Sequence, residues 1–406
     1  MENEILNITL KKGMPITGEK PIELPPITGD PFIFKGDEGN PFLAPRGVFL
    51  IKNHLFVTDT GQNRVFIWKS LDDLGFGTSN FSEDAPKSEI RNPKSLLVLG
   101  QMDKDDTGRN SGKKVSASTL HYPSGIWSDG EKLIVADAWN HRVLIWHSMP
   151  TENGQAADVV IGQPDFESNE PNTKGIGANP TERSLNWCYG VFSDGERLWI
   201  ADTGNRRVLF FNTIPTENYA AADGVIGKPN FNERDYDNAD AIWPYSVKIS
   251  PEGKMAITDT QYYRILLWND WQKAFTQKAD AIIGQKDFDS SGANQYGLYP
   301  QAHTLNWCYD TCFYKNGIFV ADAGNSRVLW FDNTPSCHAP LAVTTSPIAT
   351  NLIGKKDFNT GSENRDTVFG TDKNLYWPFS ICIENDIMAI ADTGNHRIFL
   401  NKLNEL

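Results

Sequence analysis

The stretch Val135-Ala-Asp-Ala-Trp-Asn-His-Arg-Val-Leu-Ile-Trp146 decides the fold, because the chain contains six versions of it. Every version keeps an aspartate and, five positions later, an arginine, with apolar runs on both sides. The pairs are Asp59 and Arg64, Asp137 and Arg142, Asp202 and Arg207, Asp259 and Arg264, Asp322 and Arg327, and Asp392 and Arg397. Six copies of one motif indicate a repeat architecture.

Each copy is typical of a β-hairpin. In the second copy, residues 133–136 and 143–146 are β-branched, apolar runs, and the turn between the strands is rich in Gly and Asn in most copies. The aspartate ends one strand and the arginine begins the next, so we predict that they pair across the turn. A buried charge pair is costly without further hydrogen bonds. Because every unit needs this pair, we interpret all six as structural pins.

Two further patterns fix the size of a unit. An aromatic or Pro/Cys-containing string precedes each aspartate, and an Ile-Gly-Gln-like string follows most arginines. One unit is therefore four antiparallel strands, and radial repetition of such units is an all-β, six-bladed β-propeller. The predicted blades span about 45–103, 123–166, 188–231, 244–288, 308–358 and 378–400. The propeller as a whole covers residues 31–406, after an N-terminal arm at 1–30.

The sixth unit stops after its third strand, at Leu400. Residues 31–36 imitate an outer strand but precede every blade, so we predict that they complete blade six and close the ring. Residues 4–10 are the rival candidate for the same slot.

These motifs resemble the NHL-repeat family of six-bladed propellers. Asn140-His-Arg-Val143 and Asn395-His-Arg-Ile398 carry the pattern that gives the family its name, and the resemblance covers about residues 31–403. The fourth copy departs from it, because Gln261-Tyr-Tyr263 replaces the usual turn. The resemblance implies a closed ring with a binding or catalytic face at the mouth of the channel.

Composition limits the function further. The 406 residues carry a net charge of −13, with a pI of about 5.1. RNA-binding members of the family are expected to have a basic face, so this balance argues against a nucleic-acid partner. We find no apolar leader and no apolar run of membrane-spanning length. The five cysteines lack paired spacing. We therefore expect a cytoplasmic protein without a membrane partner.

The candidate site lies where each innermost strand begins. The predicted equivalent positions are aromatic in five blades, at Tyr122, Trp187, Trp243, Trp307 and Trp377, with Ala44 in blade one. Two interpretations stay open: the rings wedge between blades as core, or they form the wall of a ligand pocket. Residues that break the repeat are better functional candidates, and these are Arg46, His121, Asn186 and Asn306. Arg46 has the chemistry to seat an anionic group.

Two cysteines extend this candidate site. Cys188 and Cys308 lie in identical strings, Leu185-Asn-Trp-Cys-Tyr189 and Leu305-Asn-Trp-Cys-Tyr309. Either the two strings form a paired site across the axis, or they reflect duplication of a blade pair.

No motif for a catalytic triad, a phosphate-binding loop or a zinc site is present in the sequence. We therefore predict a binding or interaction module for a small molecule, a protein or a peptide. The alternative is a lyase, isomerase or hydrolase that uses His121, Asn186, Asn306 and one of the cysteines in the same pocket. No cofactor is predicted; calcium in the channel is the one metal that the composition leaves open.

Overall fold

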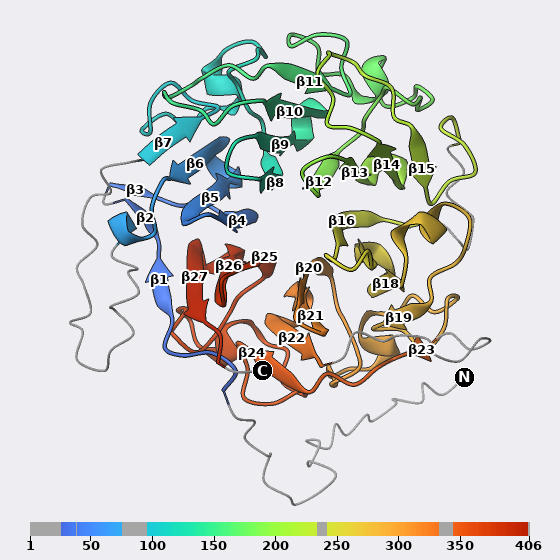
Figure 1. The fold of residues 1–406 in the computed structure, drawn as a ribbon. Coiled ribbons are helices and arrows are strands. Elements are labelled where there is room, and N and C mark those ends of the chain that lie inside the picture. Colours follow the sequence, from blue (N-terminus) through green and yellow to red (C-terminus); the bar gives the residue numbers. More distant parts are fainter. Residues whose placement is uncertain (1–25, 38, 75–95, 234–241, 333–343, 405–406) are drawn as a thin grey trace, which may run out of the picture.

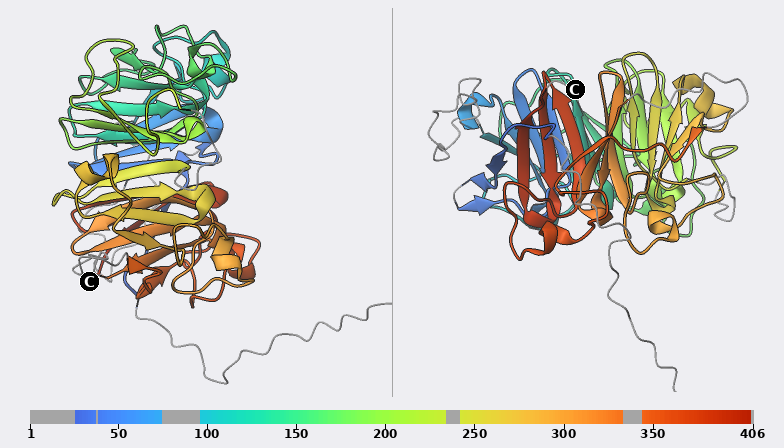
Figure 2. Two further views of the ribbon diagram at one scale, coloured as in Figure 1. Left: turned by 90° about the vertical axis from the view of Figure 1, so that its right-hand side faces the viewer. Right: turned by 90° about the horizontal axis from the view of Figure 1, so that it is seen from below.

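The computed structural model describes residues 26–37, 39–74, 96–233, 242–332 and 344–404. Six sheets stand around a central axis, and the chain visits them in order (Figure 1). The side views show the sheets packed face to face around the ring (Figure 2). The predicted six-bladed β-propeller of antiparallel blades is confirmed.

The strands of the first three blades follow one another from the axis outward. Blade one contains β4 (Gly47–Ile51), β5 (His54–Asp59), β6 (Arg64–Trp68) and β7 (Leu96–Leu99). Blade two contains β8 (Pro123–Ser128), β9 (Leu133–Asp137), β10 (Arg142–Trp146) and β11 (Val159–Ile161). Blade three contains β12 (Cys188–Ser193), β13 (Leu198–Asp202), β14 (Arg207–Phe211) and β15 (Gly224–Ile226).

The remaining blades keep this order, with additions at the rim. Blade four contains β16 (Pro244–Ile249), β17 (Met255–Asp259), β18 (Arg264–Trp268), β19 (Ala281–Ile283) and a fifth strand, β23 (Thr344–Thr345). Blade five contains β20 (Cys308–Tyr314), β21 (Gly317–Asp322), β22 (Arg327–Phe331) and β24 (Asn351–Ile353). Blade six contains β25 (Pro378–Glu384), β26 (Ile387–Asp392) and β27 (Arg397–Lys402).

The N-terminal strand β1 (Phe32–Phe34) closes blade six, as predicted. It pairs antiparallel with β27, with Phe32 opposite Leu400 and Phe34 opposite Ile398. A short hairpin, β2 (Gly36–Asp37) with β3 (Asn40–Pro41), leads from this strand into blade one. The slot is thus filled by part of residues 31–36, and the rival segment 4–10 lies outside the described residues.

The hydrophobic core lies between neighbouring blades. One cluster joins Ile134 and Ile145 of blade two to Leu198 and Leu209 of blade three, for example. Each sheet is apolar on both faces because it packs against a blade on either side, which is why the middle strands read as continuous apolar runs.

The turn after each aspartate is one turn of 3-10 helix followed by a residue in the left-handed conformation. These turns are Thr60–Gln62, Ala138–Asn140, Thr203–Asn205, Thr260–Tyr262, Ala323–Asn325 and Thr393–Asn395. The left-handed residues that follow are Asn63, His141, Arg206, Tyr263, Ser326 and His396. The turn-forming role predicted for the motif is confirmed, including blade four, where Tyr263 takes the left-handed position despite its bulk.

Candidate functional site

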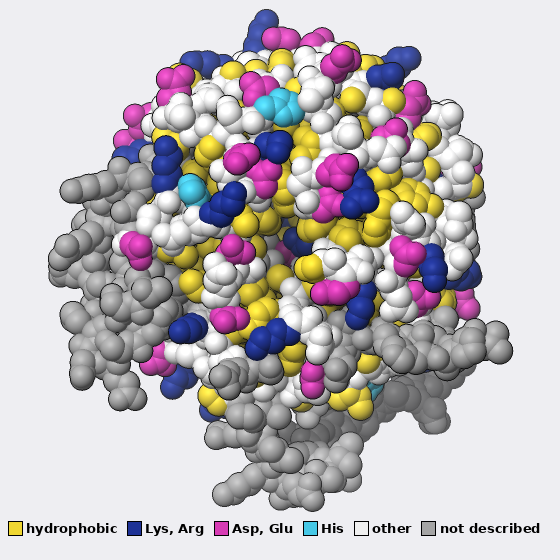
Figure 3. Space-filling view, in the orientation of Figure 1, with side chains coloured by type: hydrophobic (Ala, Val, Ile, Leu, Met, Phe, Trp, Pro, Cys, Tyr) yellow, Lys and Arg dark blue, Asp and Glu magenta, His cyan; other side chains and the backbone are white. Residues whose placement is uncertain are grey.

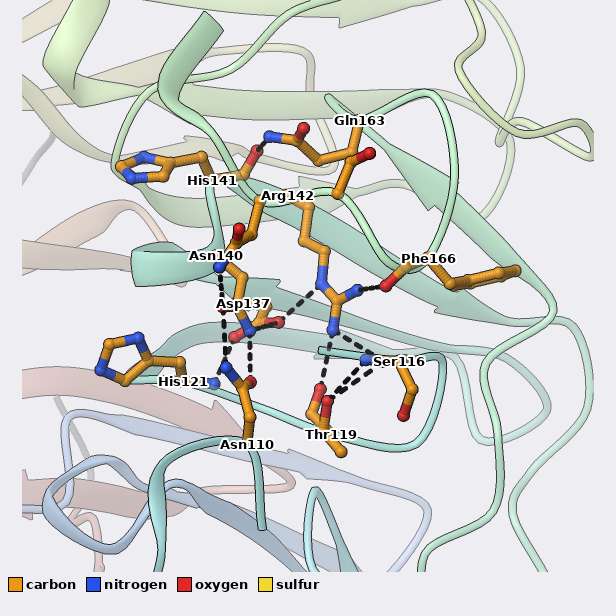
Figure 4. Close-up of polar contacts among 12 residues, drawn as sticks. Asn110, Ser116, Thr119, His121, Asp137, Asn140, His141, Arg142, Gln163 and Phe166 are labelled. Carbon is orange, nitrogen blue, oxygen red and sulfur yellow. Dashed lines mark hydrogen bonds and ion pairs between the residues drawn. The ribbon is translucent and has the colours of Figure 1, made fainter. Parts of the chain in front are cut away.

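The aspartate and arginine of each repeat form a fully buried ion pair, as Figure 4 shows for blade two. Arg142 Nε lies 2.8 Å from Asp137 Oδ2, and the other guanidinium nitrogens donate to the carbonyls of Phe166, Ser116 and Thr119. The second oxygen, Asp137 Oδ1, accepts the His121 N–H at 2.7 Å. The segments that join one blade to the next are called connectors below. The pair ties the turn to the connectors before and after the blade, and its predicted structural role is confirmed.

A buried asparagine pair extends this network and was not predicted. In blade two, Asn140 Nδ2 donates to Asp137 Oδ2 and to Asn110 Oδ1, both at 2.8 Å, and Asn110 donates back. The same exchange joins Asn172 to Asn205, Asn294 to Asn325 and Asn364 to Asn395. The sequence does carry a signal, since each connector asparagine lies nine residues after the Gln or Lys at 101, 163, 285 or 355.

The left-handed residue of each turn reaches the next blade. His141 Nδ1 accepts the Trp187 N–H at 3.0 Å, and Asn63 Oδ1 accepts the Tyr122 N–H at 3.0 Å. His396 Nδ1 accepts the Ala44 N–H at 2.9 Å and so joins blade six to blade one. Burial lowers the pKa of His141 to about 4, so the ring is neutral and able to accept. The histidine of the repeat therefore joins blades.

Blade four corrects one alignment made from sequence. The Trp243 N–H donates to Asp259 Oδ1 at 2.7 Å, which is the role of His121, Asn186 and Asn306 in their blades. Trp243 was predicted to match Trp187 instead. Compared with blade three, blade four has one residue fewer in the connector before β16 and one more in the turn between β16 and β17. The spacing in the sequence was therefore misleading.

The aromatic residues before the innermost strands lie on the face where the connectors run, which we call the connector face. Trp187, Trp307 and Trp377 are 37%, 43% and 46% exposed, and Trp139 of the blade-two turn is 44% exposed. These three indoles are therefore partly buried and partly exposed, and Trp187 and Trp307 contact His141 and Tyr263 of the preceding blades. The opposite face, on which the C-terminal end lies (Figures 1 and 2), has apolar side chains between mixed charges and is hollowed near its centre (Figure 3).

The axial channel is lined by a different set of aromatic rings. Tyr189 stacks on Tyr245 with ring centroids 4.7 Å apart, Tyr245 meets Tyr309 at 4.6 Å, and Tyr309 stacks on Phe379 at 3.9 Å. These residues come two positions after the predicted ones and sit at a bulge of the innermost strand in blades three to six. Burial raises the pKa of the Tyr189 and Tyr309 phenols, which stay protonated.

Arg46 fills the centre of this ring. Its guanidinium carbon lies 4.3 Å from the Phe379 ring centroid and 4.9 Å from that of Tyr122, and Nη1 donates to Tyr245 Oη at 2.9 Å. Because aromatic rings lie this close to the guanidinium and one of its nitrogens is hydrogen-bonded, the side chain closes the channel and acts as its plug. The remaining cavity along the axis measures about 30 Å³, enough for about one water molecule. The prediction that Arg46 seats an anion remains untested, but this geometry gives it no support.

A second charged pair lies deeper in the channel. Lys248 Nζ is 3.3 Å from Asp310 Oδ1, and Asp310 Oδ2 accepts from Ser380 Oγ and the Ile381 N–H, each at 3.0 Å. Burial is the largest influence on the pKa of Lys248 and lowers it, but Asp310 together with Cys312 and Cys382 outweighs burial, so the pKa is raised. The pair joins the innermost strands of three neighbouring blades, β16, β20 and β25, and its polar atoms are engaged with one another.

The other predicted site residues do not converge. Cys188 and Cys308 are fully buried, with their thiols directed at the Arg142 and Arg264 carbonyls, and burial raises the pKa of both. His121 packs edge-on against Trp139, and Asn186 lies over Gly204. His121, Asn186 and Asn306 do not line the axial cavity, so of the predicted set only Arg46 does.

Within the described ranges, no group of three or more His, Cys, Asp or Glu side chains is arranged to hold a metal ion. In the same part of the chain, no helix combines the length and hydrophobicity that crossing a membrane requires.

Comparison with protein-family models finds no match. Among curated proteins, human NHL repeat-containing protein 2 is 21% identical over 386 residues, which cover 88% of this chain and 46% of that protein. The chain thus spans about half the length of this relative.

Solved structures with a similar fold have low sequence identity. An auxiliary nutrient binding protein from Bacteroides thetaiotaomicron has a TM-score of 0.49 at 12% identity, covering 90% of this chain and 70% of that one. A streptogramin B lyase has a TM-score of 0.45 at 11% identity, covering 92% and 97%. Similarities at this level transfer no function.

The six blades and the filled axis define a six-bladed β-propeller whose repeats are built around a buried Asp–Arg pair. In its Asn-His-Arg motifs and in its 21% identity with the human protein, the chain is similar to NHL-repeat proteins.

Proposed function

We propose that this propeller is a binding module that holds a protein segment on its connector face, with Trp187, Trp307 and Trp377 as the main contacts. One observation carries the proposal: these indoles are exposed at positions where the fold does not need them.

In blade one, Ala44 occupies the position that these indoles hold in blades three, five and six. Its φ is 50°, and Trp187, Trp307 and Trp377 have φ values of 49°, 47° and 53°, so all four occupy the same left-handed position at the start of a blade. An alanine is sufficient there in blade one. Bulky residues in this conformation are uncommon, and the indoles stay 37–46% exposed. Their presence therefore favours a role outside the fold.

The kind of ligand follows from the shape of the surface. A small-molecule site in the channel would usually enclose about 300–1,000 Å³, whereas the axial cavity measures about 30 Å³. Aromatic side chains distributed over several blades suit a flat or extended partner, since Trp and Tyr are enriched at protein interfaces. The same cavity volume disfavours the alternative of an enzyme that acts inside the channel.

The test is a peptide-selection experiment on the full chain. A library of random dodecapeptides displayed on phage is selected against the immobilised protein, and enriched peptides are synthesised for affinity measurement. We expect the variant with Trp187→Ala, Trp307→Ala and Trp377→Ala to lose about tenfold or more in affinity, because buried Trp anchors dominate such interfaces.

The matched control is Ile348→Ala, which removes another apolar side chain, 69% exposed, from the segment between β23 and β24. Peptides that bind the triple variant as tightly as the parent would contradict the proposal, and so would a selection that enriches no peptide.

A further inference from the structure

In blades one, two and four, the outer edge is covered by a segment of the following blade, which protects the open strand edge. On blade one, the Val98 N–H donates to Asn153 Oδ1 at 3.0 Å, and the Gly154 N–H donates to the Val98 carbonyl at 2.9 Å. On blade two, Asn218 and Tyr219 make the same two bonds with Val160. The repeated Pro-Thr-Glu-Asn strings at 150–153 and 215–218 therefore serve as edge caps.

Blade four is covered by backbone instead. Strand β23 lies parallel to β19, with Thr345 opposite Ile282, and the Ser346 N–H donates to the Ile282 carbonyl at 3.1 Å. In all three cases the cap comes from the segment between the third and fourth strands of the next blade. An extended segment can thus cap the outer edge of a blade, as β23 does on β19.

Among the described residues, no such cap lies on blade five, whose following blade is completed by the N-terminal strand β1. The third strand of blade six runs to Lys402, and its fourth strand comes from the N-terminus. The two chain ends meet instead, since the Gly29 N–H donates to the Lys402 carbonyl and the Asn404 N–H to the Ile27 carbonyl, both at 3.0 Å. The predicted arm at 1–30 is therefore held to the rim from residue 26 onward.

A groove of about 580 Å³ opens beside this uncapped edge, between residues 26–31 and β24. Leu352 of β24 lies opposite Leu329 and is the equivalent of Val98 in β7 and Val160 in β11. Like those two residues, it directs its backbone N–H and carbonyl away from its own sheet. The N–H is bonded to the Asn351 side chain at 2.8 Å, and no described residue donates to the Leu352 carbonyl.

We propose that residues 4–10 of the same chain dock as an extended strand on β24 and cap blade five. The described structure begins at Pro26, which itself lines the groove, so the arm has only to fold back from this point to reach β24. The 15 residues from 11 to 25 span up to about 50 Å when extended, which is ample for a return along β24.

The composition of the segment fits this site. Leu6, Ile8 and Leu10 alternate with Asn7 and Thr9, which gives a strand one apolar and one polar face. Charge is complementary as well. Lys355, Lys356, Arg365 and Lys373 line the groove against Asp30 and Asp372, and the start of the arm carries Glu2 and Glu4.

Photo-cross-linking on the full chain tests the proposal. A p-benzoylphenylalanine placed at Ile8 should, on irradiation, give an intramolecular adduct that peptide mapping places at residues 351–356 or 26–31. The same probe at Glu19 is the control, and we expect it to give no such adduct. Leu352→Pro in the Ile8-probe chain should lower the adduct yield by about fivefold or more, because proline has no N–H that the docked strand could take over from the Asn351 side chain.

Three results would overturn the proposal. The adduct could map elsewhere on the propeller, or its yield could be unchanged by Leu352→Pro in a chain whose circular dichroism matches the parent. An adduct at residues 351–356 found only in a cross-linked dimer, with a yield that rises with protein concentration, would assign the groove to the arm of a second copy.

Discussion

Blades two and four hold the same ion pair with different surroundings. In blade two, Asp137 accepts from Arg142, His121 and Asn140. In blade four, Asp259 accepts from Arg264 at 2.8 Å and from the Trp243 N–H at 2.7 Å, while Tyr262 stands where the asparagine would be and lies under the Arg264 guanidinium. Blade four also lacks the left-handed residue before its first strand. The blade therefore tolerates the loss of both features while the Asp–Arg pair and its backbone anchor remain.

The largest expected effect breaks the feature that both blades share. Asp137→Ala leaves the fully buried Arg142 without its counter-charge, so we expect a loss of about 3–5 kcal/mol in the free energy of unfolding. Urea denaturation measures it. The control is Glu182→Ala, which removes an exposed partner 3.9 Å from Arg183 and should cost less than about 1 kcal/mol. Equal losses for the two variants would refute the role given to the buried pair.

The next variant sharpens the difference between the blades. Asn140→Ala removes one donor to Asp137 and leaves the buried Asn110 amide without its partner, which should cost about 1–3 kcal/mol. Tyr262→Ala, at the equivalent place in blade four, breaks no such exchange and should cost less. Thermal unfolding of both variants decides the matter; a larger loss for Tyr262→Ala would mean that the asparagine pairs are incidental.

A pH effect of similar size follows from His141. Its pKa in the folded chain is about 4, below the usual 6.5, so the unfolded chain binds more protons between these values. Stability from this residue is complete above pH 6.5 and falls as the pH drops toward 4, by an amount on the order of 1–3 kcal/mol.

His141→Asn should reduce the loss of stability between pH 7 and pH 4, because Asn63 makes the same bond to the next blade without titrating. Urea denaturation at both pH values compares the variant with the parent. An identical loss in the two proteins would show that His141 does not sense pH.

A smaller effect is expected in the channel. Arg46→Met removes a cation that faces Phe379 and Tyr122 and is bonded to Tyr245, which should cost about 1–2 kcal/mol. Arg206→Met removes a cation 4.8 Å from the Trp243 ring and is the matched control; its cost should be about 0.5–1 kcal/mol. If thermal unfolding shows no difference between them, Arg46 is not the plug of the axis.

The repeated part of the molecule could be predicted from sequence because each element recurs with its spacing. The Asp–Arg pairing and the closing strand followed from the position of Asp137 relative to Arg142 and from the imitation of an outer strand at 31–36. The asparagine exchange was equally regular, nine residues after Gln101 or Gln163, but it lies in connectors whose sequences otherwise differ.

The site could be predicted less well, because side-chain direction depends on local backbone geometry. Trp187 takes a left-handed φ of 49°, and the strand then bulges at Tyr189, so the second residue faces the axis and the first faces solvent. Neither the left-handed conformation nor the bulge can be predicted from the spacing of aromatic residues. The same holds for Trp243, whose place shifts because a connector is one residue shorter while a hairpin is one residue longer.

The central claim is that buried networks hold the ring together while the indoles of the connector face are left for binding. The free energy of unfolding of the variant with Trp187→Ala, Trp307→Ala and Trp377→Ala tests it most directly. Since Ala44 already occupies the equivalent position in blade one, we predict a value within about 1.5 kcal/mol of the parent, as for surface substitutions. A loss of several kcal/mol per indole, comparable with that of Asp137→Ala, would make these residues part of the core and contradict the account.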